Sequence, residues 1–311
     1  KNFGAGIYLN LSNYNLIENN TCILNEAGIH LNFSNNNIIK NNVCNSNEKF
    51  GIHLMGNSSN NVVVNNVCNS NGEIGINLQY FCNNNSLTKN TCIWNKMTNI
   101  NIEGSSYNEL LYNSLSMSAR GISLIGENTL GNRVNWNNIE GHKLGISEEP
   151  VNVNAIFNWW GDPSGPYHPT KNPNGLGDIV FDYADFDPWS KEPITNAPTL
   201  PRVLVGNLSI CPRRVEIGQP ITISVTLKNT KETKSIYEIR LSINGTIAAQ
   251  KNVTLAPKET KVVSFEVMEK REGVYEVNIG DVFGIFWVEK VVRPTKIKTI
   301  TVPIDYPTIQ E

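Results

Sequence analysis

Residues 28–54 read GIHLNFSNNNIIKNNVCNSNEKFGIHL, so the tetrapeptide at 28–31 returns at 51–54. The same Gly-Ile pair recurs through the first half of the chain in steps of 22 to 24 residues. A fixed period of this size indicates a solenoid, in which each unit packs against its neighbours. The pairs begin at Gly6, Gly28, Gly51, Gly75, Gly121 and Gly145, and Asn99-Ile100 fills the one gap.

A second position, which we call the marker, recurs with the same period as the Gly-Ile pair. It always holds an apolar residue or cysteine, at Cys22, Cys44, Cys68, Cys92, Leu115 and Ile139. Asn stands two residues before every marker, at Asn20, Asn42, Asn66, Asn90, Asn113 and Asn137, and seven residues before it, at Asn15, Asn37, Asn61, Asn85, Asn108 and Asn132. Stacked strands place equivalent residues about 4.8 Å apart, so their amides can bond along the stack. Asn also tolerates left-handed corners. We therefore predict two Asn ladders around a core column that contains four cysteines.

Apolar residues alternate within each unit, as in Ile29-x-Leu31, which is the period of a β-strand. Short strands separated by Asn, Ser and Gly bury their apolar face only by stacking coil on coil. A left-handed hexapeptide helix and a leucine-rich repeat are the alternatives, but their subperiod and signature are missing. The fold class predicted is all-β: a right-handed parallel β-helix over residues 1–192, followed by an immunoglobulin-like β-sandwich.

These coils resemble the parallel β-helix repeats of the NosD-like and pectin-lyase-like families over residues 1 to about 190. The stretches NWWGDPSGP at 158–166 and DFDPW at 185–189 resemble the closing segment of such surface proteins. An open β-helix end exposes apolar core and strand edges. We expect aromatic side chains to cover it, namely Trp159, Trp160, Phe181, Tyr183, Phe186 and Trp189.

Composition changes at a Pro-rich linker, 193–201, and Asn becomes rarer beyond it. Regular short strands separated by turn residues predict a sandwich over 202–292. The order GQPITISV at 218–225, ING at 243–245 and LAPKET at 255–260 resembles the adhesion-related, CARDB-type immunoglobulin-like modules of prokaryotic surface proteins. The strands are expected at 221–228, 237–243, 246–255, 261–267, 274–279 and 283–289.

The tail at 293–311 resembles the opening of another β-helix. This implies self-association, or joining of neighbouring repeats of one polypeptide, in which a strand of Thr299, Ile300, Thr301 and Val302 pairs with a β-helix edge. A fragment cut from a longer polypeptide is the alternative, and the residues do not decide between them.

Catalytic side chains are scarce. Enzymes of this fold act on polysaccharides with paired carboxylates, or with acidic and basic groups together. Residues 1–161 hold no Asp and only two Arg, and their Glu residues are scattered over the repeat. We therefore expect no enzyme; a polysaccharide lyase or hydrolase is the least favoured reading.

Candidate metal ligands come from three groups of side chains, cysteines, histidines and aspartates. The resemblance to NosD-like proteins suggests copper binding by the four repeat cysteines. These cysteines share their column with Leu115 and Ile139, however, which indicates that they are core residues. His30 and His53 occupy the same outward-facing position in consecutive coils. They could form a two-His metal site, but we expect a solvated strand face. The one cofactor retained is calcium, which binds oxygen ligands. Its candidates are Asp178, Asp182, Asp185 and Asp187, with a polar capping loop as the alternative.

Other surface features point outside the cell. Tyr112 and Trp136 share one offset in adjacent coils, which suggests a stacked platform for sugar. A net charge of −2 gives no reason to expect nucleic acid, and no apolar run is long enough to cross a membrane. The expected function is an extracellular scaffold of a prokaryotic, archaeal-type cell surface, with a glycan-binding adhesin as the alternative. Glycosylation sequons stand at Asn10, Asn19, Asn32, Asn57, Asn84, Asn207, Asn244 and Asn252.

Overall fold

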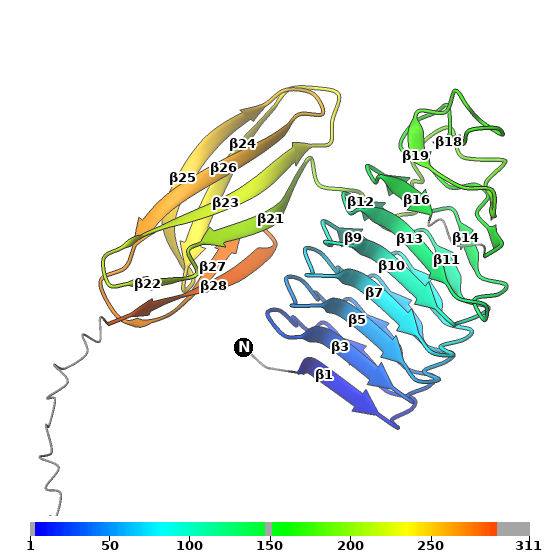
Figure 1. Ribbon diagram of the computed structural model, residues 1–311, viewed down its shortest axis with the longest axis horizontal. Helices are drawn as coiled ribbons and strands as arrows, with labels where there is room; N and C mark the ends of the chain where they lie inside the picture. Colours follow the sequence, from blue (N-terminus) through cyan, green and yellow to red (C-terminus); the bar gives the residue numbers. More distant parts are fainter. Residues whose placement is uncertain (1–3, 147–150, 291–311) are drawn as a thin grey trace, which may run out of the picture.

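The structure is a computed structural model that describes residues 4–146 and 151–290. It confirms the predicted fold class: a right-handed parallel β-helix is followed by an immunoglobulin-like sandwich. The coils stack from β1 at one end to β19 at the other, and the sandwich lies beside them rather than beyond them (Figure 1).

Three parallel sheets form the sides of the β-helix. The first runs in the order β1 (Ala5–Asn10), β3 (Ala27–Asn32), β5 (Phe50–Met55), β7 (Ile74–Gln79), β10 (Thr98–Glu103), β13 (Arg120–Ile125), β16 (Leu144–Ile146), β19 (Gly177–Ile179) and β18 (Pro166–Tyr167). The second runs β2 (Leu16–Glu18), β4 (Ile38–Lys40), β6 (Val62–Val64), β8 (Ser86–Thr88), β11 (Glu109–Leu111), β14 (Arg133–Asn135), β17 (Val153–Asn154) and β20 (Ala184–Asp185). The third contains β9 (Thr91–Ile93), β12 (Ser114–Ser116) and β15 (Asn138–Glu140).

The coils stack in register, so the core is built of columns of like side chains. Ile29 pairs with Ile52, and Ile52 with Ile76, while Leu31, Leu54 and Leu78 follow two residues later. The predicted core role of the cysteines is confirmed, because all four lie in the column of Leu115 and Ile139 and are buried.

Both predicted Asn ladders are present. Asn42 Nδ2 donates to Asn66 Oδ1 at 3.0 Å, and Asn66 Nδ2 donates to Asn90 Oδ1 at 3.0 Å. The second ladder repeats this from Asn37 to Asn61 at 3.1 Å. One detail of the prediction was wrong: the left-handed residue is the one before each ladder Asn. The positive φ values lie at Asn19, Asn41, Asn65, Lys89, Tyr112, Trp136 and Phe157 in one corner.

Two further ladders were not predicted. Asn47 Nδ2 donates to Asn71 Oδ1 at 3.1 Å, and Asn71 Nδ2 continues to Asn95 Oδ1 at 3.0 Å. In a fourth corner, Ser34 Oγ accepts from Ser12 N at 3.0 Å. The buried Cys82 belongs to this serine column, where its backbone N–H donates to Ser105 Oγ at 3.0 Å. Side-chain ladders therefore support four corners of the coil.

The Gly of each Gly-Ile pair stands where the third ladder meets the cysteine column. A Cβ on Gly51 would lie 2.6 Å from the Gly75 carbonyl oxygen and 2.9 Å from Cys68 Cβ. A side chain at Gly51 would therefore force its neighbours to shift, although Asn99 takes the equivalent position one coil after Gly75.

The closing segment seals the β-helix as expected. Trp160 and Phe186 are buried in the core, and Trp189 packs against it half-buried. Tyr183, by contrast, is exposed. Asn158 ends the first ladder, accepting from Asn137 Nδ2 at 3.1 Å.

The sandwich consists of two sheets of mostly antiparallel strands around one apolar core. Every expected strand forms, and two strands were missed, the long β21 and the short β22. The first sheet is β21 (Val203–Cys211), β23 (Pro220–Asn229) and β26 (Thr260–Met268). The second is β22 (Arg214–Glu216), β28 (Val282–Glu289), β27 (Gly273–Ile279), β24 (Ser235–Ile243) and β25 (Thr246–Leu255).

Candidate functional site

The sandwich folds back along the third side of the β-helix, and this seam carries the candidate site. Ile194 N donates to Asn138 Oδ1 at 2.7 Å in the linker, near the closed end. Phe283 N donates to Ser46 Oγ at 2.9 Å, near the opposite end. Between them Trp94 packs with Leu204 in a small apolar cluster. The seam therefore runs across most coils.

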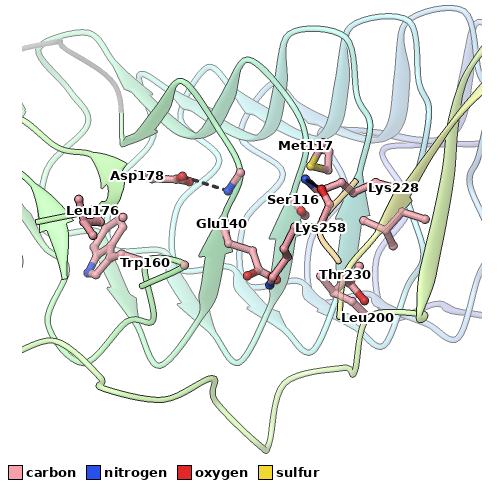
Figure 2. Close-up of a pocket in the computed structure, with 14 residues that line it drawn as sticks. Ser116, Met117, Glu140, Trp160, Leu176, Asp178, Leu200, Lys228, Thr230 and Lys258 are labelled. Carbon is pink, nitrogen blue, oxygen red and sulfur yellow. Dashed lines mark hydrogen bonds between the residues drawn. The ribbon is translucent and has the colours of Figure 1, made fainter. Parts of the chain in front are cut away.

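A pocket of about 240 Å³ opens in the seam near the closed end (Figure 2). Met117, Leu200 and Leu204 form an apolar wall of this pocket. Glu140, the last residue of β15, also lines it. Lys228 comes from β23 and Lys258 from the turn before β26, so both domains contribute to the lining. Pockets between domains are frequent ligand sites.

The two lysines of this pocket already have partners. Lys228 Nζ donates to the Lys258 carbonyl at 2.6 Å, and Lys258 Nζ lies 3.1 Å from Glu232. Burial and the nearby Lys258 charge lower the pKa of Lys228, while Glu140 opposes this shift. The pocket can hold a small polar ligand, but the lining shows no activated nucleophile.

A His–Asp pair lies beneath the pocket and is structural. Asp178 accepts hydrogen bonds from the backbone N–H groups of Gly141 and His142 and lies 2.6 Å from His142 Nδ1. Asn99 Nδ2 lies 2.9 Å from His142 Nε2. Because Asn99 donates there, Nε2 accepts and Nδ1 carries the proton. The His142 side chain is fully buried and that of Asp178 is 7% exposed at the pocket lining, and Asn99 links the pair to Asn95 at the end of the third ladder.

The expectation of a solvated surface at His30 and His53 was wrong for His53, which is buried, whereas His30 is half-buried. The rings stack with centroids 4.6 Å apart, and His53 is buried with Nε2 3.1 Å from Gln79 Oε1. The Phe50 ring packs against His53, with centroids 4.6 Å apart, and helps to cover it. Burial, with the neighbouring His30, lowers the pKa of His53 to about 4. The ring is therefore neutral at pH 7.

The four predicted calcium ligands are not brought together. Asp178 is bonded to His142, and Asp182 lies 3.1 Å from His168. Asp185 and Asp187 are exposed. Within 4–146 and 151–290, no three His, Cys, Asp or Glu side chains are grouped to hold a metal ion. Asp178 and Asp182 serve instead as partners of His142 and His168 at the closed end.

The predicted sugar platform has a different geometry. Trp136 stacks on Phe157, with centroids 4.6 Å apart and planes at 16°, and Trp136 is exposed. Tyr112 occupies the same left-handed corner one coil earlier, half-buried. The stacked pair is therefore Trp136 with Phe157. The signal that was missed is the corner position of Phe157, directly before ladder residue Asn158.

The predicted glycosylation sites lie mostly at the surface. Seven of the eight sequon Asn side chains are exposed, and Asn32, which donates to Asn10 Oδ1 at 3.1 Å, is half-buried. The strand Thr299–Val302 lies outside the described residues. In the part of the chain that the structure describes, no helix is long and apolar enough to cross a membrane.

Comparisons with known proteins agree with this architecture. A family model described as "Periplasmic copper-binding protein (NosD)" matches residues 1–158. A double mutant of the periplasmic alginate epimerase AlgG is similar in structure, with a TM-score of 0.50 and 19% identity over 60% of this chain. The chain spans about half of that epimerase, 47% of its length. At this identity the likeness shows a common fold alone.

The CARDB domain of a Pyrococcus furiosus protein, solved in complex with di-metal ions, is a second structural match. It has a TM-score of 0.25 and 24% identity, and it covers 28% of this chain and 91% of that domain. No curated protein matches the sequence.

Proposed function

This chain belongs to the NosD family, and from that premise and the docked sandwich we propose that it is a non-enzymatic structural module outside the cytoplasm. The family is described as periplasmic, which supports that location. A cell-surface position and an archaeal envelope, which the sequons suggested, remain part of the proposal. In this role the β-helix and the sandwich act as one rigid body.

The observation that carries the proposal is the seating of Trp94 on Gly206. Trp94 is 9% exposed, and a Cβ on Gly206 would lie 2.2 Å from its ring. An indole buries roughly 150–250 Å², so at about 25 cal/mol per Å² its burial contributes about 4–6 kcal/mol. Hydrogen bonds at Ser46 and Asn138 fix the two ends of the seam. A scaffold that transmits load needs such a rigid joint.

Unfolding of Gly206→Leu tests this proposal. The new side chain would displace Trp94, so we expect the wild type to unfold in one thermal transition and this variant to unfold in two. Cleavage of the 193–201 linker by protease should also accelerate. Thr222→Leu adds the same side chain on an exposed position of β23 and serves as the control. Identical behaviour of both variants and the wild type would contradict the rigid joint.

The proposal that the chain is not an enzyme rests on the side chains found at the seam. The His142 side chain is fully buried and bonded to Asp178 and Asn99, and the lysines of the pocket are engaged. Turnover of pectin- or alginate-type polymers by the purified chain would overturn it.

Copper, which the family description names, was tested against the donor set. The core cysteines are buried and stand one to a coil. No group of three potential ligands occurs among the described residues. These residues do not fit a copper centre.

The proposal includes assembly. The strand Thr299–Val302 would pair with β1 of a neighbouring copy or repeat, where Ile7 and Leu9 are half-buried while Ile29 and Leu31 are buried. We expect the chain to self-associate in sedimentation experiments and a chain ending at residue 290 to stay monomeric. Equal behaviour of the two would argue against strand addition.

A glycan-binding adhesin is the second candidate, and the exposed Trp136–Phe157 stack favours it. Aromatic faces of this kind can pack on sugar rings. Glycan-array binding that is lost in Trp136→Ala would support this function, and an unchanged array would exclude the platform.

A further inference from the structure

The bend between the first and second sheets of the β-helix carries exposed aromatic side chains. In successive coils this bend consists of residues 11–14, 33–36, 57–60, 81–84 and 104–107, each with one member of the serine column or Cys82. Its exposed rings are those of Tyr14, Phe33, Phe81 and Tyr107. The five segments contain no Asp, Glu, Lys, Arg or His. We call this surface the aromatic bend.

The four rings stand where the backbone is unfavourable for them. Their φ values are 60° at Tyr14, 46° at Phe33, 65° at Phe81 and 58° at Tyr107. Bulky residues rarely adopt this left-handed conformation, whereas Asn does so more readily. Other coils place Asn at the same two positions, at Asn57 in the column of Phe33 and Phe81, and at Asn36, Asn60 and Asn84 in the column of Tyr14 and Tyr107. The coil therefore does not need aromatic rings here, and bulky residues kept in a strained conformation indicate a function.

The next coil holds two of these rings in place. A Cβ on Gly56 would lie 3.1 Å from Cζ of Phe33, and a Cβ on Gly131 would lie 2.6 Å from Cδ1 of Tyr107. Each ring thus packs on the bare backbone of a glycine in the following coil, while much of the ring stays exposed. Because these rings are already fixed, a ligand that covers them would immobilise little further.

A line of polar side chains runs along the bend beside the rings. Asn35 Oδ1 accepts from the backbone N–H of Ser59 at 2.7 Å, and Asn83 Oδ1 accepts from the backbone N–H of Ser106 at 2.6 Å. These bonds orient both amides and leave their Nδ2 groups without a partner among the described residues. Both Asn residues are half-buried, and neither Nδ2 is one of the buried atoms that lack a partner. A ligand on the bend can therefore reach both donors.

Ring and donor recur as a unit along the bend. Phe33 with Asn35 and Phe81 with Asn83 have the same spacing in the sequence and lie two coils apart, which corresponds to roughly 10 Å along the axis. An aromatic face can pack on the apolar face of a sugar ring, and an oriented amide can donate to its hydroxyl groups. Because the bend carries no charge, an ionised ligand would lose hydration without gaining a partner. The repeat therefore favours an uncharged chain of sugar rings.

We propose that the aromatic bend binds an extended, uncharged polysaccharide lengthwise. Sugar rings pack on Phe33 and Phe81, and sugar hydroxyl groups accept from Nδ2 of Asn35 and Asn83. The binding is non-covalent. This inference goes beyond the structural role proposed above, and the bend is a different surface from the corner that carries the Trp136–Phe157 stack.

Isothermal titration calorimetry of the full chain with cellohexaose and chitohexaose tests the proposal. The chain should come from a host without N-glycosylation, because Asn57 and Asn84 are sequon residues of the bend. We expect a neutral hexasaccharide to bind and an acidic oligogalacturonate not to bind. Phe81→Asn should weaken binding roughly two- to tenfold through the lost ring contact. Asn83→Ser should weaken it roughly three- to tenfold through the lost donor.

Both variants use residues that the same columns already contain, at Asn57 and Ser59, so the coil should stay folded, and melting curves check this. Trp136→Asn removes a ring from the other corner, where Asn41 and Asn65 stand in earlier coils, and should leave the affinity unchanged.

Two results would overturn the proposal. One is that neither neutral hexasaccharide binds. The other is that Trp136→Asn abolishes binding while Phe81→Asn and Asn83→Ser bind like the wild type. Failure here leaves the rigid-joint test at Gly206 unaffected, so the two proposals fail separately.

Discussion

Deleting one ladder amide, in Asn66→Ala, should destabilise the β-helix strongly. Asn66 Oδ1 accepts from both the N–H and Nδ2 of Asn42 at 3.0 Å, and its Nδ2 donates to Asn90 Oδ1 at 3.0 Å and to the Ile39 carbonyl at 2.9 Å. The side chain is fully buried. At about 1 kcal/mol for each of these bonds, the loss is about 4 kcal/mol. The backbone N–H of Asn42 is also left without its partner.

The neighbouring residue gives a matched control. Asn65 is exposed with a φ of 54°, so Asn65→Gly removes the same amide while keeping a left-handed corner. A loss of about 4 kcal/mol lowers Tm by about 8–16 °C in a unit of this size. Circular dichroism melting of both variants is the assay. We expect Asn65→Gly to stay within about 2 °C of the wild type, since surface changes cost little. Equal Tm values for the two variants would refute the ladder argument.

Three further changes test other parts of the fold. Gly51→Ala places a methyl group 2.6 Å from the Gly75 carbonyl oxygen, so unfolding by urea should show a loss of about 1–3 kcal/mol. The low pKa of His53 means that its stability contribution is complete above pH 6.5 and is lost as the pH falls toward 4, by about 3 kcal/mol. His53→Asn should flatten this pH dependence of Tm. An unchanged pH profile in the variant would show that a group other than His53 causes the loss of stability. Cys68→Ala should lower Tm, because the thiol fills a buried core position; a gain in stability would contradict the core role.

The sequence predicted the β-helix because each coil repeats the same side chains at the same corners. It misassigned the left-handed residue for a related reason. In pairs such as Asn41-Asn42 the two amides are identical, and only the structure shows that the first turns the corner while the second bonds along the stack. The third ladder could have been found, since Asn25 and Asn47 each stand three residues after a marker Cys.

Other features depend on contacts between residues far apart in the chain, and no periodic pattern encodes them. His53 lies at an outward position, yet Phe50 and His30 cover it, so its burial could not be read from alternation alone. The docking of the sandwich depends on Trp94 meeting Gly206, a residue more than a hundred positions later. The Pro-rich linker predicted a boundary, but not the direction in which the sandwich folds back.

Small-angle X-ray scattering of the chain ending at residue 290, which is expected to stay monomeric, tests the central claim, that the β-helix and the sandwich form one rigid unit. We predict a profile that fits the folded-back arrangement of Figure 1 and a radius of gyration that rises in Gly206→Leu but not in Thr222→Leu. A wild-type profile that requires two independently oriented domains would contradict the account.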